Sequence, residues 1–100
     1  MITKYKIFES VYRLPKIGDY VLFDKDCIFG YSGDLNEGYY IGQLKSTIDE
    51  GYWIGNVENI QKEYNSKREY LITNKRFKEC WYSENKEELE NILKEKKYNL

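Results

Sequence analysis

An alternation of apolar and polar positions runs through much of the chain and predicts strands. Residues 3–13 alternate with a period of two, which is typical of a strand with one buried face. Residues 20–23 form a continuous apolar run, which is typical of a strand buried on both faces. Residues 24–26 then predict a turn, and residues 27–31 predict a further short extended segment.

One segment occurs twice in the middle of the chain. Residues 37–44 read EGYYIGQL and residues 50–57 read EGYWIGNV, so five of the eight positions are identical. Each copy is a turn signal followed by aromatic and β-branched residues, which favour extended structure. The repeat therefore predicts two neighbouring strands, over residues 39–48 and 52–57.

A tight loop should join these two strands. Asp49-Glu50-Gly51 suits a three-residue hairpin loop with Gly51 in the left-handed conformation. Each predicted strand also has an interior glycine, Gly42 or Gly55, and such a residue is typical of a bulge, a bend or a close backbone approach. Two glycines at equivalent places predict a strongly curved sheet.

The last part of the predicted sheet is less regular. Residues 58–66 are polar and predict either a helical turn or a long loop. Residues 69–73 and 76–82 have strand character and flank Asn74-Lys75, which predicts a further hairpin.

The chain ends with an amphipathic helix, predicted over residues 85–97. Asn85 and Glu88 have the spacing of a capping box, and Ser83 is a competing cap. Leu89, Ile92 and Leu93 share one face, which should pack on the sheet.

The predicted fold class is α+β, as a single domain over residues 1–100 with a β-rich part at 3–82. The sheet should be small, curved and antiparallel, because strands and helices do not alternate as in parallel folds. Ile17-Gly18-Asp19-Tyr20-Val21 is similar to the first strand of SH3-like and Tudor-like barrels, which implies an SH3-like partial barrel as one form of this sheet.

Composition limits the classes of function. The net charge is −1 with 33% charged residues, which is unlike a strongly basic nucleic-acid-binding domain. Eleven Tyr, one Pro and no Ala indicate AT-rich coding, and hence a low-GC bacterium or a phage or mobile element within one. Long apolar runs and a signal-peptide core are absent, so a cytoplasmic location is expected.

The sequence contains few residues suited to catalysis or to binding a metal ion or cofactor. The chain has no His, the commonest general base, so we expect no enzyme activity. Cys27 and Cys80 are too few for a structural zinc site, and we expect reduced thiols. Residues 34–38 resemble the start of a calcium loop, but Leu44 stands where such a loop needs a Glu. We expect no metal and no cofactor.

Paired aromatic residues favour protein binding. Adjacent strand residues point to opposite faces, so one buried face cannot take both members of a pair. Exposed Tyr and Trp are typical of interface centres, although a covered second face would make them core residues instead. The candidate binding residues, with their acidic rim, are Tyr39, Tyr40, Tyr52, Trp53, Asp34 and Glu37.

The favoured hypothesis is a non-enzymatic protein-binding module. Given the AT-rich coding, its most concrete form is a phage or mobile-element inhibitor that sterically blocks a host defence protein, as an anti-CRISPR protein does. An immunity protein or antitoxin is a close alternative, and a homodimer is a further one.

A second hypothesis is a small nucleic-acid-binding barrel. Five cations fall between residues 67 and 78 and are interleaved with aromatic residues, as in single-strand binding grooves. They are Lys67, Arg68, Lys75, Arg76 and Lys78.

Overall fold

The computed structural model describes residues 3–4, 14–30, 35, 38–59 and 64–98. Within these ranges the chain forms β-strands, one 3₁₀ helix and two α-helices. In chain order they are β1 (Thr3–Lys4), β2 (Tyr20–Asp24), η1 (Lys25–Cys27), β3 (Ile28–Phe29), β4 (Tyr39–Ile48), β5 (Gly51–Asn59), β6 (Tyr64–Ser66), β7 (Tyr70–Thr73), α1 (Asn74–Phe77), β8 (Trp81–Ser83) and α2 (Lys86–Tyr98).

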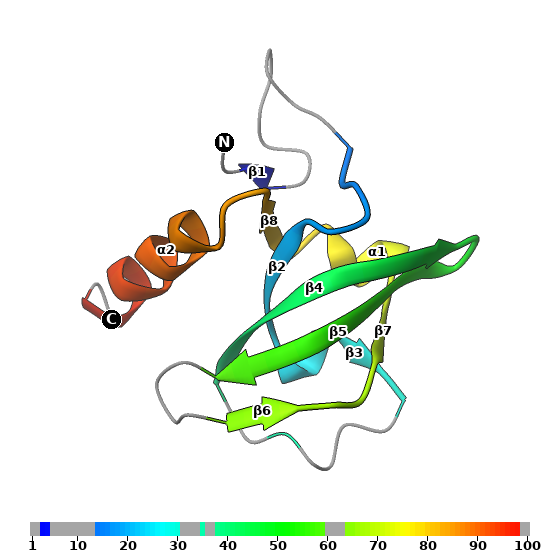
Figure 1. The fold of residues 1–100 in the computed structure, drawn as a ribbon, viewed down its shortest axis with the longest axis horizontal. Helices are drawn as coiled ribbons and strands as arrows, with labels where there is room; N and C mark the ends of the chain where they lie inside the picture. The colour runs from blue at the N-terminus through cyan, green and yellow to red at the C-terminus, as the bar shows by residue number, and fades with distance from the viewer. Residues whose placement is uncertain (1–2, 5–13, 31–34, 36–37, 60–63, 99–100) are drawn as a thin grey trace.

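All of the strands belong to one antiparallel sheet. Its order is β1-β8-β2-β4-β5-β7-β3, and β6 pairs with the far end of β5. Figure 1 shows the long β4–β5 hairpin crossing the molecule, with α2 on one side of the fold. In the described part of the chain β1 does not pair with β3, so the sheet is open. The predicted α+β class, with a curved antiparallel sheet and a C-terminal helix, is confirmed.

The curvature is built into the β4–β5 hairpin. Strand β5 has one extra residue between Gly55 and Glu58, compared with the facing part of β4. Strand β4 in turn has one extra residue between Leu44 and Ser46, compared with the facing part of β5. Asn56 lies in the first of these bulges and has a left-handed backbone, with φ of 50°. Because bulges bend a strand and increase its twist, two of them make the hairpin curl.

The two interior glycines meet different neighbours. A Cβ atom at Gly42 would lie 2.4 Å from Cγ2 of Ile54 and 3.0 Å from Cγ2 of Val57, which are buried side chains. A Cβ atom at Gly55 would lie 3.0 Å from Cγ of Lys45, which is part of a flexible stem. Gly42 therefore permits close packing inside the curl, whereas Gly55 faces a neighbour that can move.

The sheet separates two hydrophobic cores. We term the one inside the curl the inner core and the one under α2 the outer core. The inner core contains Val21, Phe23, Cys27, Ile28, Leu35, Tyr40, Leu44, Ile54, Val57, Tyr70, Ile72, Phe77, Cys80 and Tyr82. The outer core contains Leu22, Ile41, Leu89 and Leu93, with Tyr20, Tyr39, Trp81 and Ile92 packed against it. Strand β2 contributes to both cores, as its continuous apolar run predicted.

Helix α2 confirms the predicted C-terminal helix, and both predicted caps act at its start. Asn85 Oδ1 accepts a hydrogen bond from the Glu87 amide at 2.9 Å, and Ser83 Oγ accepts one from the Asn85 amide at 3.0 Å. Ser83 Oγ also donates to the Glu88 carboxylate. This bond lowers the pKa of Glu88, and partial burial opposes the shift. Among the described residues no helix has the length and apolar character needed to cross a membrane.

The predicted three-residue loop at Gly51 is wrong. Ile48 pairs with Gly51, so the turn contains only Asp49 and Glu50, and Gly51 is a strand residue without a left-handed backbone. The glycine is needed for a different reason, since a Cβ atom there would lie 2.2 Å from the Ile72 carbonyl oxygen. Close approach of β7 to β5 therefore requires this glycine.

The predicted hairpin over residues 69–82 is also wrong. Strand β7 pairs with β5 and β3, β8 pairs with β2 and β1, and α1 separates them. Thr73 starts this helix, because its Oγ1 accepts a hydrogen bond from the Arg76 amide at 3.4 Å. Residues 58–66 were expected to form a helical turn or loop, but the end of β5 and strand β6 lie there, and residues 60–63 are outside the described ranges. Of the strand predicted at 3–13, only β1 is described.

Candidate functional site

The four predicted aromatic residues have different environments. Tyr40 is 2% exposed and lies in the inner core, where its ring stacks with the Phe23 ring at a centroid distance of 6.2 Å. Tyr52 packs against the same core and stacks on Phe77 at a centroid distance of 4.1 Å. Tyr39 packs against the outer core, where burial, followed by nearby negative charge, raises the pKa of its hydroxyl. Trp53 is half-buried and belongs to neither core.

Trp53 is part of a row of apolar side chains across three strands. Its neighbours Tyr52 and Ile54 face the inner core, so Trp53 points to the outer face. The register places Leu71 opposite Trp53 and Phe29 opposite Leu71, and directly opposed residues project from the same face. We term Phe29, Leu71 and Trp53 the apolar row.

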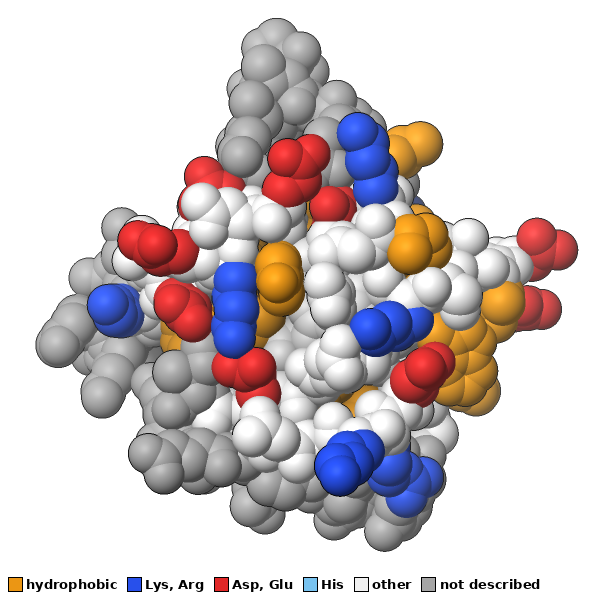
Figure 2. Space-filling view, in the orientation of Figure 1, with side chains coloured by type: hydrophobic (Ala, Val, Ile, Leu, Met, Phe, Trp, Pro, Cys, Tyr) orange, Lys and Arg blue, Asp and Glu red, His pale blue; other side chains and the backbone are white. Residues whose placement is uncertain are grey.

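This row is accessible to solvent. Phe29 is 65% exposed, and Leu71 and Trp53 are half-buried. Ile48 lies diagonally from Trp53 on the neighbouring strand and is 41% exposed. In Figure 2 hydrophobic side chains gather at the right of the molecule, below the tip of the β4–β5 hairpin. A contiguous apolar surface of this kind is typical of an interaction site.

Hydrogen bonds from α1 hold the hairpin tip beside the row. The Asn74 side chain donates from Nδ2 to the Asp49 carbonyl oxygen at 2.8 Å, and the Asn74 amide donates to the Glu50 carbonyl oxygen at 2.9 Å. The turn is therefore anchored to the body of the protein, and Ile48 and Trp53 are carried on a fixed element.

Acidic side chains lie near the row and at the hairpin tip. Asp49 and Glu50 are exposed at the tip, and Glu69 lies on the outer face near Gly55 with its Cγ 3.3 Å from the position of a Cβ there. Lys45 lies beside Glu69 on this face. The predicted rim residues Asp34 and Glu37 lie outside the described residues.

The five predicted nucleic-acid-binding cations form two groups. Lys67 and Arg68 precede β7, whereas Lys75 and Arg76 lie in α1 and Lys78 follows it. All five are exposed, and the groups are separated by β7, a strand of about 13 Å. Arg76 forms an exposed ion pair with Glu79 at 3.5 Å. The structure therefore does not bring these cations together into one cluster.

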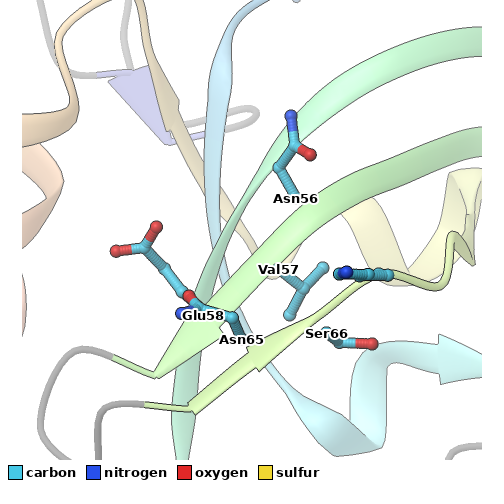
Figure 3. Close-up of a pocket in the computed structure, with 6 residues that line it drawn as sticks. Asn56, Val57, Glu58, Asn65 and Ser66 are labelled. Carbon is cyan, nitrogen blue, oxygen red and sulfur yellow. The ribbon is translucent and has the colours of Figure 1, made fainter.

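A hollow of about 280 Å³ lies where β5 passes from β7 to β6. It is lined by Asn56, Val57, Glu58, Asn65, Ser66 and Lys67. Figure 3 shows the ends of the Asn56 and Glu58 side chains pointing away from Ser66. The Glu58 carboxylate forms an ion pair with Lys86 Nζ at 2.6 Å, and Asn56 Nδ2 donates a hydrogen bond to Gln43 Oε1 at 3.1 Å. The polar ends of Asn56 and Glu58 are therefore engaged outside the hollow, and Ser66 Oγ is hydrogen-bonded to the Tyr70 hydroxyl at 2.8 Å.

Cys27 and Cys80 both lie in the inner core as free thiols. A hydrogen bond from Cys80 lowers the pKa of Cys27, against the opposing effects of burial and of Asp24. The same bond, together with burial, raises the pKa of Cys80 well above its usual range. The Cys80 thiol can also donate to the Arg76 carbonyl oxygen, at 3.7 Å.

In the part of the chain that the structure describes, no group of three or more Cys, Asp or Glu side chains is arranged to hold a metal ion. The apolar row is therefore the strongest candidate site.

Three of the residues at this site were missed from the sequence. Phe29, Leu71 and Ile48 stand in separate segments, and their proximity follows from strand order, which one sequence does not reveal. Ile48 had a weak local signal, because it is an apolar residue in a polar stretch directly before a turn.

Comparisons with protein-family models, with curated proteins and with solved structures found no match for this chain. The likeness of residues 17–21 to SH3-like barrels therefore stays a prediction.

Proposed function

We propose that this protein is a non-enzymatic protein-binding module and that the apolar row is the centre of its binding surface. The observation that carries the proposal is Phe29, a large aromatic side chain that is 65% exposed and continuous with Leu71 and Trp53. Aromatic residues on a rigid support give a large contact area for a small loss of side-chain entropy. Phe and Trp are accordingly enriched at interface centres.

The partner is a protein with an apolar surface edged by basic residues. Asp49 and Glu50 at the hairpin tip and Glu69 on the outer face are acidic and exposed, so basic groups on the partner would complement them. A standard interface covers about 800 Å² on each partner. The contact therefore extends beyond the row, over the hairpin tip.

The biological form of this proposal is inhibition of a host protein by steric blocking. Its support is the AT-rich residue usage, with eleven Tyr and no Ala, together with the small size of the chain. Under this hypothesis a phage or mobile element encodes the protein. Its target is a host defence protein, such as a CRISPR-type protein. An immunity protein or antitoxin would use the same surface in the same manner.

A capture experiment with a matched control tests the proposal. Tagged wild-type protein and the variants Phe29→Ser and Ile17→Ser are used to capture partners from a nuclease-treated lysate of a low-GC bacterium. Ile17 is 62% exposed and lies in the turn before β2, outside the row. A partner lost with Phe29→Ser and retained with Ile17→Ser supports the proposal, and equal retention by both variants contradicts it.

The other hypotheses give different results in the same experiment. A nucleic-acid-binding barrel would lose its partners on nuclease treatment, and its affinity would fall steeply with salt. A homodimer would be recovered as untagged copies of the same chain when both forms are expressed together.

A further inference from the structure

The apolar row lies between an acidic end and a basic end of the sheet. Glu50 is exposed at the hairpin tip, three residues before Trp53 in the chain. Lys67 and Arg68 are exposed and lie four and three residues before Leu71. Because Trp53 and Leu71 are paired on antiparallel strands, counting back from each of them leads in opposite directions. Figure 2 shows acidic side chains at the tip on the right, hydrophobic side chains below them and basic side chains at the bottom.

The two charged ends lie at similar distances from the row. At a rise of about 3.3 Å per residue, three or four residues span roughly 10–13 Å. Asp49 adds a second negative charge to the acidic end, and the hydrogen bonds from Asn74 hold the tip in place. This surface is complementary to itself, because a second copy that faces it with reversed strands brings row against row and each acidic end against a basic end. A twofold axis along the row gives this arrangement.

We propose that two copies of this chain form a symmetric homodimer through their apolar rows, and that the dimer covers the row until a partner displaces one copy. The inference rests on the proposed function in that both concern the apolar row. The chain itself carries the apolar surface edged by basic residues that complements this row. The strands of the two copies run in opposite directions, because the parallel arrangement would place the two acidic ends against each other.

The small size of the row makes this dimer weak. A large aromatic side chain buries about 150–250 Å². Leu71 and Trp53 are already half-buried within the fold, so the three side chains of the row supply less than the roughly 800 Å² per side of a standard interface. Interfaces of such small area belong to transient complexes. The dimer therefore dissociates on dilution and releases the row to a partner that covers more of the surface.

The mass of the protein at increasing concentration tests the dimer. Sedimentation velocity is run on wild type, Phe29→Ser and Ile17→Ser over a wide range of concentration. We expect wild type and Ile17→Ser to shift from monomer to dimer, and Phe29→Ser to need a concentration about tenfold or more higher for the same shift. A wild type that stays monomeric throughout, or a Phe29→Ser variant that dimerises like wild type, would overturn the proposal.

Reversal of one charged end at a time tests the antiparallel arrangement. The variant Asp49→Lys/Glu50→Lys has two basic ends, and the variant Lys67→Glu/Arg68→Glu has two acidic ends. Each variant alone places like charges at both contacts of the dimer, so each should dimerise about tenfold or more weakly than wild type. In a mixture of the two, every contact again joins opposite charges, so a heterodimer should form.

Native mass spectrometry with one variant labelled with ¹⁵N identifies this heterodimer. Its formation also shows that both variants are folded. The matched controls are Glu84→Lys and Lys94→Glu, which reverse exposed charges next to and within α2 and should dimerise like wild type. Undiminished dimers of both end variants, or folded variants that stay monomeric when mixed, would overturn the antiparallel dimer.

The capture experiment separates this inference from the proposed function. A wild-type protein that is monomeric at every concentration but captures a partner through Phe29 would overturn the homodimer and leave the proposed function standing. A dimer that depends on Phe29, in a protein that captures no other partner, would support the homodimer and contradict the proposed function.

Discussion

Asn56 Nδ2 donates a hydrogen bond of 3.1 Å to Gln43 Oε1, and the two residues hold the same place in the two copies of the repeated segment. The two copies lie on the antiparallel strands β4 and β5, so equivalent residues are close to each other only near the middle of the hairpin. Equivalent residues elsewhere lie in different environments. Tyr40 points into the inner core, whereas its equivalent Trp53 points to the outer face. The similarity in sequence is therefore not a similarity in role.

Tyr40 and Trp53 should respond differently to truncation. Tyr40→Ala removes a buried ring and should lower the free energy of unfolding by about 3 kcal/mol or more. Trp53→Ala should change stability much less and should weaken partner binding by ~2 kcal/mol or more, because an anchor is lost. Denaturant unfolding and a binding titration measure the two effects. Equal destabilisation by the two substitutions would contradict their placement on opposite faces.

The equivalent glycines give a second matched pair. Gly42→Ala would place a methyl group against the buried Ile54 and should cost about 1–3 kcal/mol of stability through overpacking. Gly55→Ala meets the flexible Lys45 stem, so its cost should be smaller. Urea denaturation of both variants measures the difference. A larger loss for Gly55→Ala would contradict the described packing of the hairpin.

The hydrophobic pattern of the sequence predicted those elements whose structure follows from the local order of apolar and polar residues. Strands β2, β4 and β5 and helix α2 carry strong local signals, and they were found close to their observed bounds. Helix α1 was missed because Asn74-Lys75 has the character of a hairpin turn and the residues after it have strand character, whereas the tertiary bonds of Asn74 to the hairpin tip stabilise a helical turn there. The apolar row was missed in part because Phe29 and Leu71 become neighbours only through strand order.

The cap of α2 predicts a dependence of stability on pH. The Ser83 hydrogen bond holds the pKa of Glu88 below the ordinary 4.5 in the folded state. The ionised carboxylate therefore stabilises the fold above pH 4.5, and this contribution is lost as the pH falls through the lower folded pKa. Thermal unfolding of wild type and Glu88→Gln across this range measures it.

The variant should show a shallower loss of stability in acid, because it lacks the titrating group. Ser83→Ala should raise the pKa of Glu88, as seen in an NMR titration of its carboxyl carbon. Identical acid profiles for wild type and Glu88→Gln would exclude a contribution from this group.

Charge reversal tests the acidic rim. Glu69→Lys should lower the association rate of the partner, because the rim would repel basic groups, with little effect on stability since Glu69 is exposed. Stopped-flow or surface-based kinetics at low and high salt measure this effect. A faster association for the variant would indicate an acidic partner surface.

The affinity of Phe29→Ser for the captured partner, measured beside that of Ile17→Ser, tests the apolar row most directly. Both substitutions remove an exposed apolar side chain, so their effects on the fold should be small and comparable. If the row is the centre of the binding surface, Phe29→Ser should weaken binding by about tenfold or more and Ile17→Ser should leave it unchanged. Unchanged affinity for Phe29→Ser would contradict the proposed site.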